Sequence, residues 1–305
     1  MRDTFVATLL DIAKKDKNVY IVTGDLGFGV LKPFWDNLPG QIINAGISEQ
    51  NMTGFAAGLA REGKTVFTYS IGNFPTLRCI EQIRNDCAYH NANVKIVCIG
   101  GGVVYGALGM SHHATEDLAI LRALPDVTVM APGDLVEARL ATKAIYETPG
   151  TCYLRLGRGG EKRIHQSDPD FKIGKAIKIC DGENTAIFSS GAIFDEAYKA
   201  HTLLKQKGIN TALYTFPTVK PIDKETIEHC CDKYSLIVTV EEHNIIGGFG
   251  SAVAEAMSEL NNRNSRLLRI GFNDTYASVV GSQQYLRNIY GMSGEKIAER
   301  IIENV

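Results

Sequence analysis

The sequence predicts an α/β fold with two doubly wound, mainly parallel-sheet domains. Short apolar runs rich in β-branched residues alternate with segments of helical periodicity along most of the chain. The runs are continuously apolar, which is typical of strands buried on both faces of a parallel sheet. A polar stretch with glycine and proline at 157–174 divides the pattern. We therefore expect domains at 1–160 and 175–305, joined by a linker at 161–174.

The first elements lead to a helix of small residues. Apolar residues at helical spacing predict a helix at 3–15, and apolar runs predict strands at 19–23 and 41–44. A helix is then expected at 48–61. Its small residues would allow another backbone to come close; they are Gly54, Ala56, Ala57, Gly58 and Ala60.

The remaining elements repeat this alternation. In the first domain we expect strands at 65–70, 94–99, 127–130 and 151–156, and helices at 77–89, 118–124 and 135–146. In the second domain we expect strands at 185–191, 210–214 and 236–240, and helices at 193–207 and 249–260. The segment Val240–Gly250 opens the last helix, and we interpret it as structural or as an interface.

Composition narrows the class of protein. Of 305 residues, 45% are hydrophobic and 22% charged, and the net charge of -2 gives no basic excess for nucleic acid or anionic membranes. No run approaches the ~18 apolar residues of a membrane helix. Charged residues interrupt the apolar patches near the start, so we expect no signal peptide. The seven cysteines include no Cys-x-x-Cys, which favours a reducing cytoplasm without disulfides or structural zinc.

One carboxylate, Glu49, lies at the start of the small-residue helix, where the helix N-terminus stabilises an ionised carboxylate. By position alone, Glu49 is an ordinary first-turn residue. However, Gly46-Ile47-Ser48-Glu49-Gln50 resembles the turn that opens a small-residue helix in the pyrimidine-binding domain of transketolases. In that family the Glu hydrogen-bonds the aminopyrimidine ring of thiamine diphosphate. The resemblance implies that Glu49 activates this cofactor.

The resemblance covers nearly the whole chain, with 1–156 similar to the pyrimidine-binding domain and 175–305 to the transketolase C-terminal domain. Phe74 falls on the ring that stacks against the pyrimidine in the family, and Tyr69 is a second aromatic candidate. Asp25 matches an Asp-Leu turn that lines the cofactor site. These three residues, with Glu49, are the implied cofactor contacts.

A second motif implies substrate chemistry. The segment Gly106–His113 resembles the family loop whose His lies over the reactive carbon of the cofactor, binds substrate hydroxyls and moves protons, and His112 falls on that His. Arg2 and Arg155 correspond to arginines that bind the substrate phosphate, a role that suits the forked guanidinium. Glu49 and His112 are thus the implied catalytic residues.

Some positions depart from the family pattern. Leu108 stands where transketolases carry an Asp that recognises a sugar hydroxyl, and Gly100 where they carry a His that binds sugar phosphate. The pocket is therefore expected to be less polar than in the pentose-phosphate enzyme. The identity of the donor and acceptor, and whether the substrate is phosphorylated or otherwise activated, stay open.

The chain also lacks the Gly-Asp-Gly motif that holds the diphosphate and Mg²⁺ in the family. Oxygen ligands for Mg²⁺ are therefore expected from another polypeptide, and no metal ligand from this one. The chain resembles the C-terminal subunit of a split transketolase, which implies an N-terminal partner subunit and an α2β2 heterotetramer. The helix at 48–61 is a candidate part of the contact.

Two alternatives remain open. The 2-oxoacid dehydrogenase β-subunit and deoxyxylulose-phosphate synthase share the scaffold and take a 2-oxoacid donor. Ser111-His112 and Glu116-Asp117-Leu118 favour the transketolase branch, whereas Leu108 weakens it. A non-catalytic scaffold subunit is the third possibility, and the presence of both Glu49 and His112 argues against it.

Overall fold

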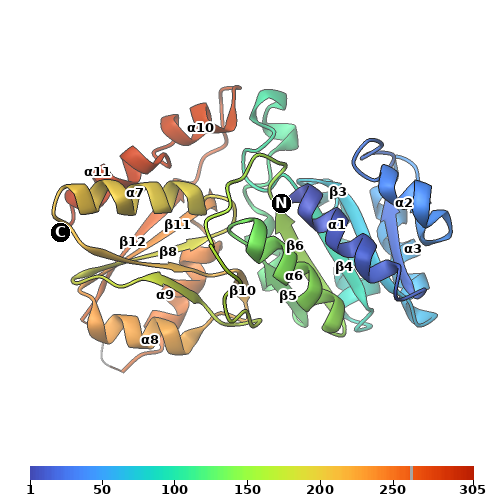
Figure 1. Ribbon diagram of the computed structural model, residues 1–305, viewed down its shortest axis with the longest axis horizontal. Coiled ribbons are helices and arrows are strands. Elements are labelled where there is room, and N and C mark those ends of the chain that lie inside the picture. Colours follow the sequence, from blue (N-terminus) through green and yellow to red (C-terminus); the bar gives the residue numbers. More distant parts are fainter. Residues whose placement is uncertain (262–263) are drawn as a thin grey trace.

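A seven-stranded sheet organises the first domain of the computed structural model, which describes residues 1–261 and 264–305 (Figure 1). Its strand order is β10-β5-β6-β4-β3-β1-β2, and every pair is parallel except β10 with β5. The strands are β1 (Val19–Thr23), β2 (Ile42–Asn44), β3 (Thr65–Ile71), β4 (Val94–Ile99), β5 (Val127–Met130), β6 (Thr151–Leu156) and β10 (Thr218–Lys220).

Helices cover both faces of this sheet. On one face, α1 (Arg2–Ala13) and α6 (Leu135–Glu147) pack against each other over the side chains of Phe67 and Leu154. On the other, α3 (Glu49–Arg61) and α5 (Asp117–Ala123) contribute to a second buried cluster. A short helix, α2 (Lys32–Asn37), follows β1. This two-sided burial explains the continuously apolar strands.

The second sheet has five strands in the order β12-β11-β8-β9-β7, parallel except for β7 with β9. Helices α7 and α11 pack on one face, and α8 and α9 on the other (Figure 1). The strands are β7 (Ile177–Cys180), β8 (Thr185–Ser190), β9 (Thr211–Thr215), β11 (Leu236–Asn244) and β12 (Arg266–Phe272), and the helices α7 (Phe194–Gln206), α8 (Lys224–Lys233), α9 (Phe249–Ser258), α10 (Gln283–Ile289) and α11 (Gly294–Ile302).

The predicted fold class is confirmed, with three local differences. The helix expected at 77–89 is divided into a 3-10 turn (Leu77–Cys79), the short α4 (Ile80–Gln82) and a π-helix (Ile83–Ala88). Strand β11 ends at Asn244, whereas the strand expected there ended at residue 240. Elements missed by the sequence patterns include β12, whose first half is only partly buried and so lacks a continuous apolar run.

The two sheets are joined by more than the linker. Strand β10 belongs to the sequence of the second domain but pairs with β5 of the first sheet. One buried cluster also continues from α3 and α5 into Phe188 and Phe216 of the second domain. In the described residues, no helix combines the length and the apolar character needed to cross a bilayer.

Candidate active site

Glu49 is the first residue of α3 and lies at the carboxyl edge of the first sheet, just after β2. Its side chain is only 5% exposed, yet its carboxylate accepts a charge-assisted hydrogen bond of 2.9 Å from Arg78 Nη1. Arg78 is 47% exposed and lies on the solvent side of the pair. The structure thus presents a nearly buried carboxylate that is reached from outside by one planar cation.

The Phe74 ring packs against the Arg78 guanidinium. The guanidinium of Arg78 lies over the Phe74 ring, 4.5 Å from its centroid, which is a cation–π arrangement. Phe74 is half-buried in the turn after β3, where its amide donates to the carbonyl of Ile71. The sequence pattern identified Glu49 and Phe74 but missed Arg78, whose only signal is its place in the turn between Phe74 and the π-helix.

His112 lies on the other side of Phe74. The two rings meet edge to face with 5.3 Å between their centroids, and Ser111 Oγ lies 3.1 Å from His112 Nδ1. Asn73 holds the loop by donating from Nδ2 to the Ser111 carbonyl at 2.9 Å. Gly72 has a positive φ of 45°, and a Cβ there would lie 2.9 Å from the His112 carbonyl oxygen. Only glycine allows these loops to approach so closely.

Asp25 lies in the turn after β1, exposed and with a φ of 57°. It exchanges two hydrogen bonds with Asn44, one from Asn44 Nδ2 to Asp25 Oδ1 and one from the Asp25 amide to Asn44 Oδ1. The same Asn44 oxygen accepts from the Gly46 amide at 3.0 Å. Asn44, which sequence reasoning did not single out, therefore ties the Asp25 turn to the turn that precedes Glu49.

The structure does not bring Tyr69 to this group. Tyr69 is 2% exposed, and its ring stacks on Phe5 of α1 with 6.3 Å between centroids. It shares the face of the sheet with Phe67, whereas α3 and Glu49 lie on the opposite face. Because side chains alternate along a strand, Tyr69 points into the core beneath α1. This position does not support the expected role of Tyr69 as a stacking partner of the pyrimidine.

Arg155 also differs from the expectation. It is 4% exposed, and its Nε donates to Asp117 Oδ2 at 2.8 Å. Its Nη2 donates to the carbonyls of Ala114 and Glu242. A Cβ on Gly101 would lie 2.5 Å from Arg155 Nε, so the guanidinium packs on bare backbone. Arg155 is a buried cation between the domains, and this geometry does not support its expected role at a substrate phosphate.

Arg158, unlike Arg155, is exposed to solvent. Its guanidinium lies 5.3 Å from the centroid of the Tyr105 ring. Burial raises the pKa of Tyr105, and the nearby charges of Arg158 and Arg2 oppose this rise. Arg2 is partly exposed and pairs with the exposed Asp3 at 2.8 Å. The Tyr105 ring also fills the space beside Gly100, where a Cβ would lie 2.2 Å from it.

The end of β11 joins the two domains through buried polar groups. Glu242 accepts from the Val103 amide at 2.7 Å and from Arg287 Nε at 2.5 Å. His243 accepts at Nε2 from the Ala119 amide and donates from Nδ1 to the Asn244 carbonyl. Burial lowers the pKa of His243 to about 4, so the imidazole is neutral. These contacts agree with the structural or interface role expected for this segment.

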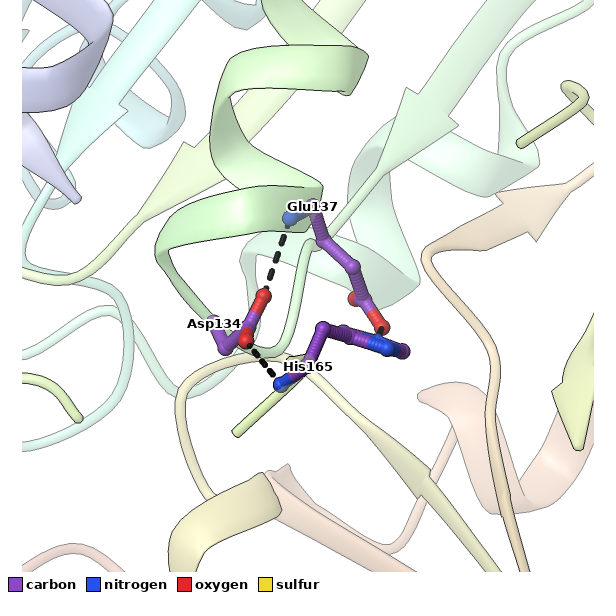
Figure 2. A group of neighbouring side chains, drawn as sticks. All are labelled: Asp134, Glu137 and His165. Atoms are coloured by element: carbon purple, nitrogen blue, oxygen red, sulfur yellow. Dashed lines mark hydrogen bonds and ion pairs between the residues drawn. The ribbon is translucent and has the colours of Figure 1, made fainter. Parts of the chain in front are cut away.

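One group of potential metal ligands in the described residues consists of Asp134, Glu137 and His165 (Figure 2). Asp134 caps α6 and accepts from four backbone amides. Glu137 accepts from the Gly133 amide, Thr215 and His165 Nε2. Burial opposes the rise, but the hydrogen bond and charge of Glu137 raise the pKa of His165. With protein donors on these oxygens, the group is a hydrogen-bonded junction and offers no open metal site.

The chemistry of the Glu49 group suits a planar, nitrogen-bearing ring. Arg78 is itself a planar, delocalised cation with N–H donors, and it is stacked on Phe74 while donating to Glu49. An aminopyrimidine has the same flat shape and can meet a carboxyl group through a ring nitrogen. The residues present therefore fit the pyrimidine of thiamine diphosphate, with His112 next to it.

Comparisons with known proteins agree with this geometry. Residues 1–160 match the family model for the transketolase pyrimidine binding domain, and residues 174–297 match the transketolase C-terminal domain. The chain is 40% identical over 308 residues to a protein of Methanocaldococcus jannaschii named as a transketolase C-terminal section, covering 100% of this chain and 96% of that protein.

Two further relatives bear on assembly. The chain is 37% identical over 307 residues to one of the subunits of the apulose-4-phosphate transketolase of Phocaeicola vulgatus, covering 100% of this chain and 97% of that protein. A solved structure of a split gene transketolase, an inactive β4 tetramer, superposes with a TM-score of 0.88 at 31% identity, covering 99% of this chain and 96% of that one.

Proposed function

The chain belongs to the transketolase family and corresponds to the C-terminal section of a split transketolase, and on this premise we propose that it transfers a two-carbon ketol unit with thiamine diphosphate. The observation that carries the proposal is the nearly buried Glu49 carboxylate, 2.9 Å from a planar cation that is stacked on Phe74. Retention of this arrangement, with His112 beside it, also argues against a non-catalytic scaffold.

Three residues would hold the pyrimidine half of the cofactor. When bound, thiamine diphosphate supplies the carbon nucleophile that carries the two-carbon unit. Glu49 would meet a ring nitrogen of the aminopyrimidine and would hold the proton shared with that atom. Phe74 gives the ring its stacking surface, and Asp25 lines the cofactor site from the turn after β1. The dry surroundings of Glu49 strengthen its hydrogen bond.

His112 would handle substrate protons. It lies beside Phe74 at the mouth of the same site and is half-buried, so it is open to a substrate yet partly shielded from water. An imidazole can both accept and donate a proton. Ser111, with its hydroxyl 3.1 Å from His112 Nδ1, is suited to orient the ring.

Two exposed or partly exposed arginines near Tyr105 are the candidates for substrate binding. Arg2 and Arg158 flank Tyr105 and are the proposed contacts for an anionic end of the substrate, in place of the buried Arg155. Leu108 is 56% exposed and gives the loop an apolar wall. A donor or acceptor sugar that lacks one polar contact of the usual ketose phosphates would suit this wall.

A partner subunit completes the site in our proposal. Its oxygen ligands would hold Mg²⁺ and the cofactor diphosphate in an α2β2 heterotetramer. Ile47 and Phe55, on either side of Glu49 in sequence, are 77% and 42% exposed, which supports a protein contact at this edge. The inactive β4 tetramer of the related split enzyme fits the idea that this type of subunit needs its partner.

The seven cysteines all lie in the described part of the chain and form no disulfide, which suits the cytoplasmic location that we propose.

The test is a reconstitution. The chain is co-expressed with a candidate N-terminal subunit, and thiamine diphosphate with Mg²⁺ is titrated by calorimetry into the chain alone and into the complex. We expect tight binding only by the complex, followed by transfer of ketose carbons to an aldose acceptor. Consumption of pyruvate without ketol transfer would instead favour the 2-oxoacid alternative. Absence of cofactor binding in both samples would favour the scaffold alternative.

A further inference from the structure

Arg78 makes two contacts that the proposed function assigns to the cofactor. Its guanidinium lies over Phe74, 4.5 Å from the ring centroid, and its Nη1 donates to Glu49 Oε2 at 2.9 Å. The flat face of the cation meets the aromatic ring, and its N–H edge meets the carboxylate. A pyrimidine ring stacked on Phe74 and bonded to Glu49 would need the same space and the same acceptor.

We propose that Arg78 competes with thiamine diphosphate for the pyrimidine site. The Arg78 side chain occupies this site in the free subunit and leaves it when thiamine diphosphate binds. This inference rests on the function proposed above. The guanidinium takes the place of the aminopyrimidine in its flat shape, in its stacking on Phe74 and in its hydrogen bond to Glu49. Cofactor binding therefore includes the breakage of the Arg78–Glu49 pair.

The free subunit gains from this contact. The Glu49 side chain is 5% exposed, and a carboxylate in such surroundings is unfavourable when it has no partner. Arg78 supplies the opposite charge without itself being buried, because 47% of its side chain remains exposed. On release, the guanidinium can return to water, so its displacement does not leave a second buried charge.

The position of Arg78 in the chain suits such a movement. It lies in the 3-10 turn Leu77–Cys79, between the loop that carries Phe74 and the π-helix Ile83–Ala88. Glu49 and Phe74 together hold its guanidinium, so release of both contacts lets the side chain swing away. A long side chain on a short turn can change rotamer while the backbone of the site stays in place.

The first experiment measures cofactor affinity in the complex with the partner subunit. Thiamine diphosphate with Mg²⁺ is titrated by calorimetry into the wild type, Arg78→Gln and the control Arg84→Gln, an exposed arginine that bonds to Asn85. We expect Arg78→Gln to bind about three- to tenfold more tightly, the range of a partly exposed ion pair with a cation–π contact, and the control to match the wild type.

The outcomes separate this inference from the proposed function. Wild-type binding with unchanged or weaker binding by Arg78→Gln would overturn the competitor role and leave the thiamine function standing. Binding by neither protein would overturn both. A second readout needs no cofactor: a double-mutant cycle of Glu49→Gln and Arg78→Gln on the urea unfolding of the chain should show a favourable coupling, and additive effects would refute the contact.

Discussion

The rings of Phe74 and His112 meet edge to face, 5.3 Å apart between centroids, although the two residues are 38 positions apart in sequence, as are the hydrogen-bonded Asn73 and Ser111 beside them. Phe74 follows β3, and His112 lies in the long connection after β4, the neighbouring strand of the sheet. The contact places the proposed stacking surface and the proposed proton-transfer group side by side.

Replacement of Phe74 by alanine should weaken cofactor binding. Loss of the stacking surface is expected to raise the Kd of thiamine diphosphate for the complex about fivefold, since an aromatic contact of this kind contributes about 1 kcal/mol. Calorimetric titration measures this. Tyr89→Ala is the matched control, because Tyr89 is an aromatic residue that is 85% exposed. Equal affinity of Phe74→Ala and wild type would remove Phe74 from the cofactor site.

Replacement of His112 by asparagine should reduce turnover and spare cofactor affinity. Loss of a general acid–base group typically lowers kcat by about 10²- to 10⁴-fold. Steady-state kinetics of ketol transfer, with calorimetry of the same variant, would show the split. The control is His90→Asn, an exposed histidine whose Nδ1 meets the Asn85 carbonyl. A His112→Asn enzyme with wild-type kcat would contradict the assigned role.

Arg155 and Arg158 should behave in opposite ways. Arg155→Ala leaves the buried Asp117 carboxylate without its ion-pair partner, and we expect the free energy of unfolding to fall by about 3–5 kcal/mol in urea titrations. Arg158→Ala, at an exposed position, should leave stability unchanged and raise KM for an anionic substrate. The reverse pattern, with a stable Arg155 variant and a raised KM, would restore a substrate-binding role for Arg155.

His243 should make the chain sensitive to acid. Its pKa is lowered to about 4 by burial, with Asp117 opposing the shift and Arg155 supporting it, whereas an unfolded histidine titrates near 6.5. The unfolded state therefore binds the extra proton first. The stability contribution is fully present above pH ~6.5 and decreases as the pH falls toward 4, by about 3 kcal/mol in total. It does not change further below pH ~4.

The measurement compares urea unfolding of wild type and His243→Asn between pH 4 and 8. The variant should lose stability less steeply than the wild type in the window from pH 6.5 to 4, since the replacement has no titrating group. The exposed His90→Asn variant serves as the control, with the slope of the wild type. Parallel curves for wild type and His243→Asn would show that His243 is not held neutral.

Sequence patterns locate the strands and the loops but do not orient every side chain. A position at a strand end indicates which edge of the sheet a residue occupies, and this is sufficient for Glu49, Phe74 and His112. It does not indicate the face: Tyr69 points with Phe67 into the core. Nor does it indicate a partner that lies far away in sequence, such as Asp117 for Arg155.

The same limit applies to contacts formed only by the tertiary fold. Nothing in the local sequence pairs Arg78 with Glu49, which is 29 residues away. Likewise, β10 is a three-residue strand that gains its partner only when the second domain returns to β5. Such short or long-range elements carry little periodic signal, because their stability comes from the neighbours that they meet.

The proposed activation of thiamine diphosphate by Glu49 can be measured as exchange of the C2 proton of the bound cofactor. The exchange rate in deuterated buffer is measured by quenched NMR for complexes with wild type, Glu49→Gln and Glu62→Gln, an exposed glutamate at the end of the same helix. We predict that Glu49→Gln still binds the cofactor but exchanges at least about 100-fold more slowly, with Glu62→Gln like the wild type. Exchange by Glu49→Gln at the wild-type rate would show that Glu49 does not activate the cofactor.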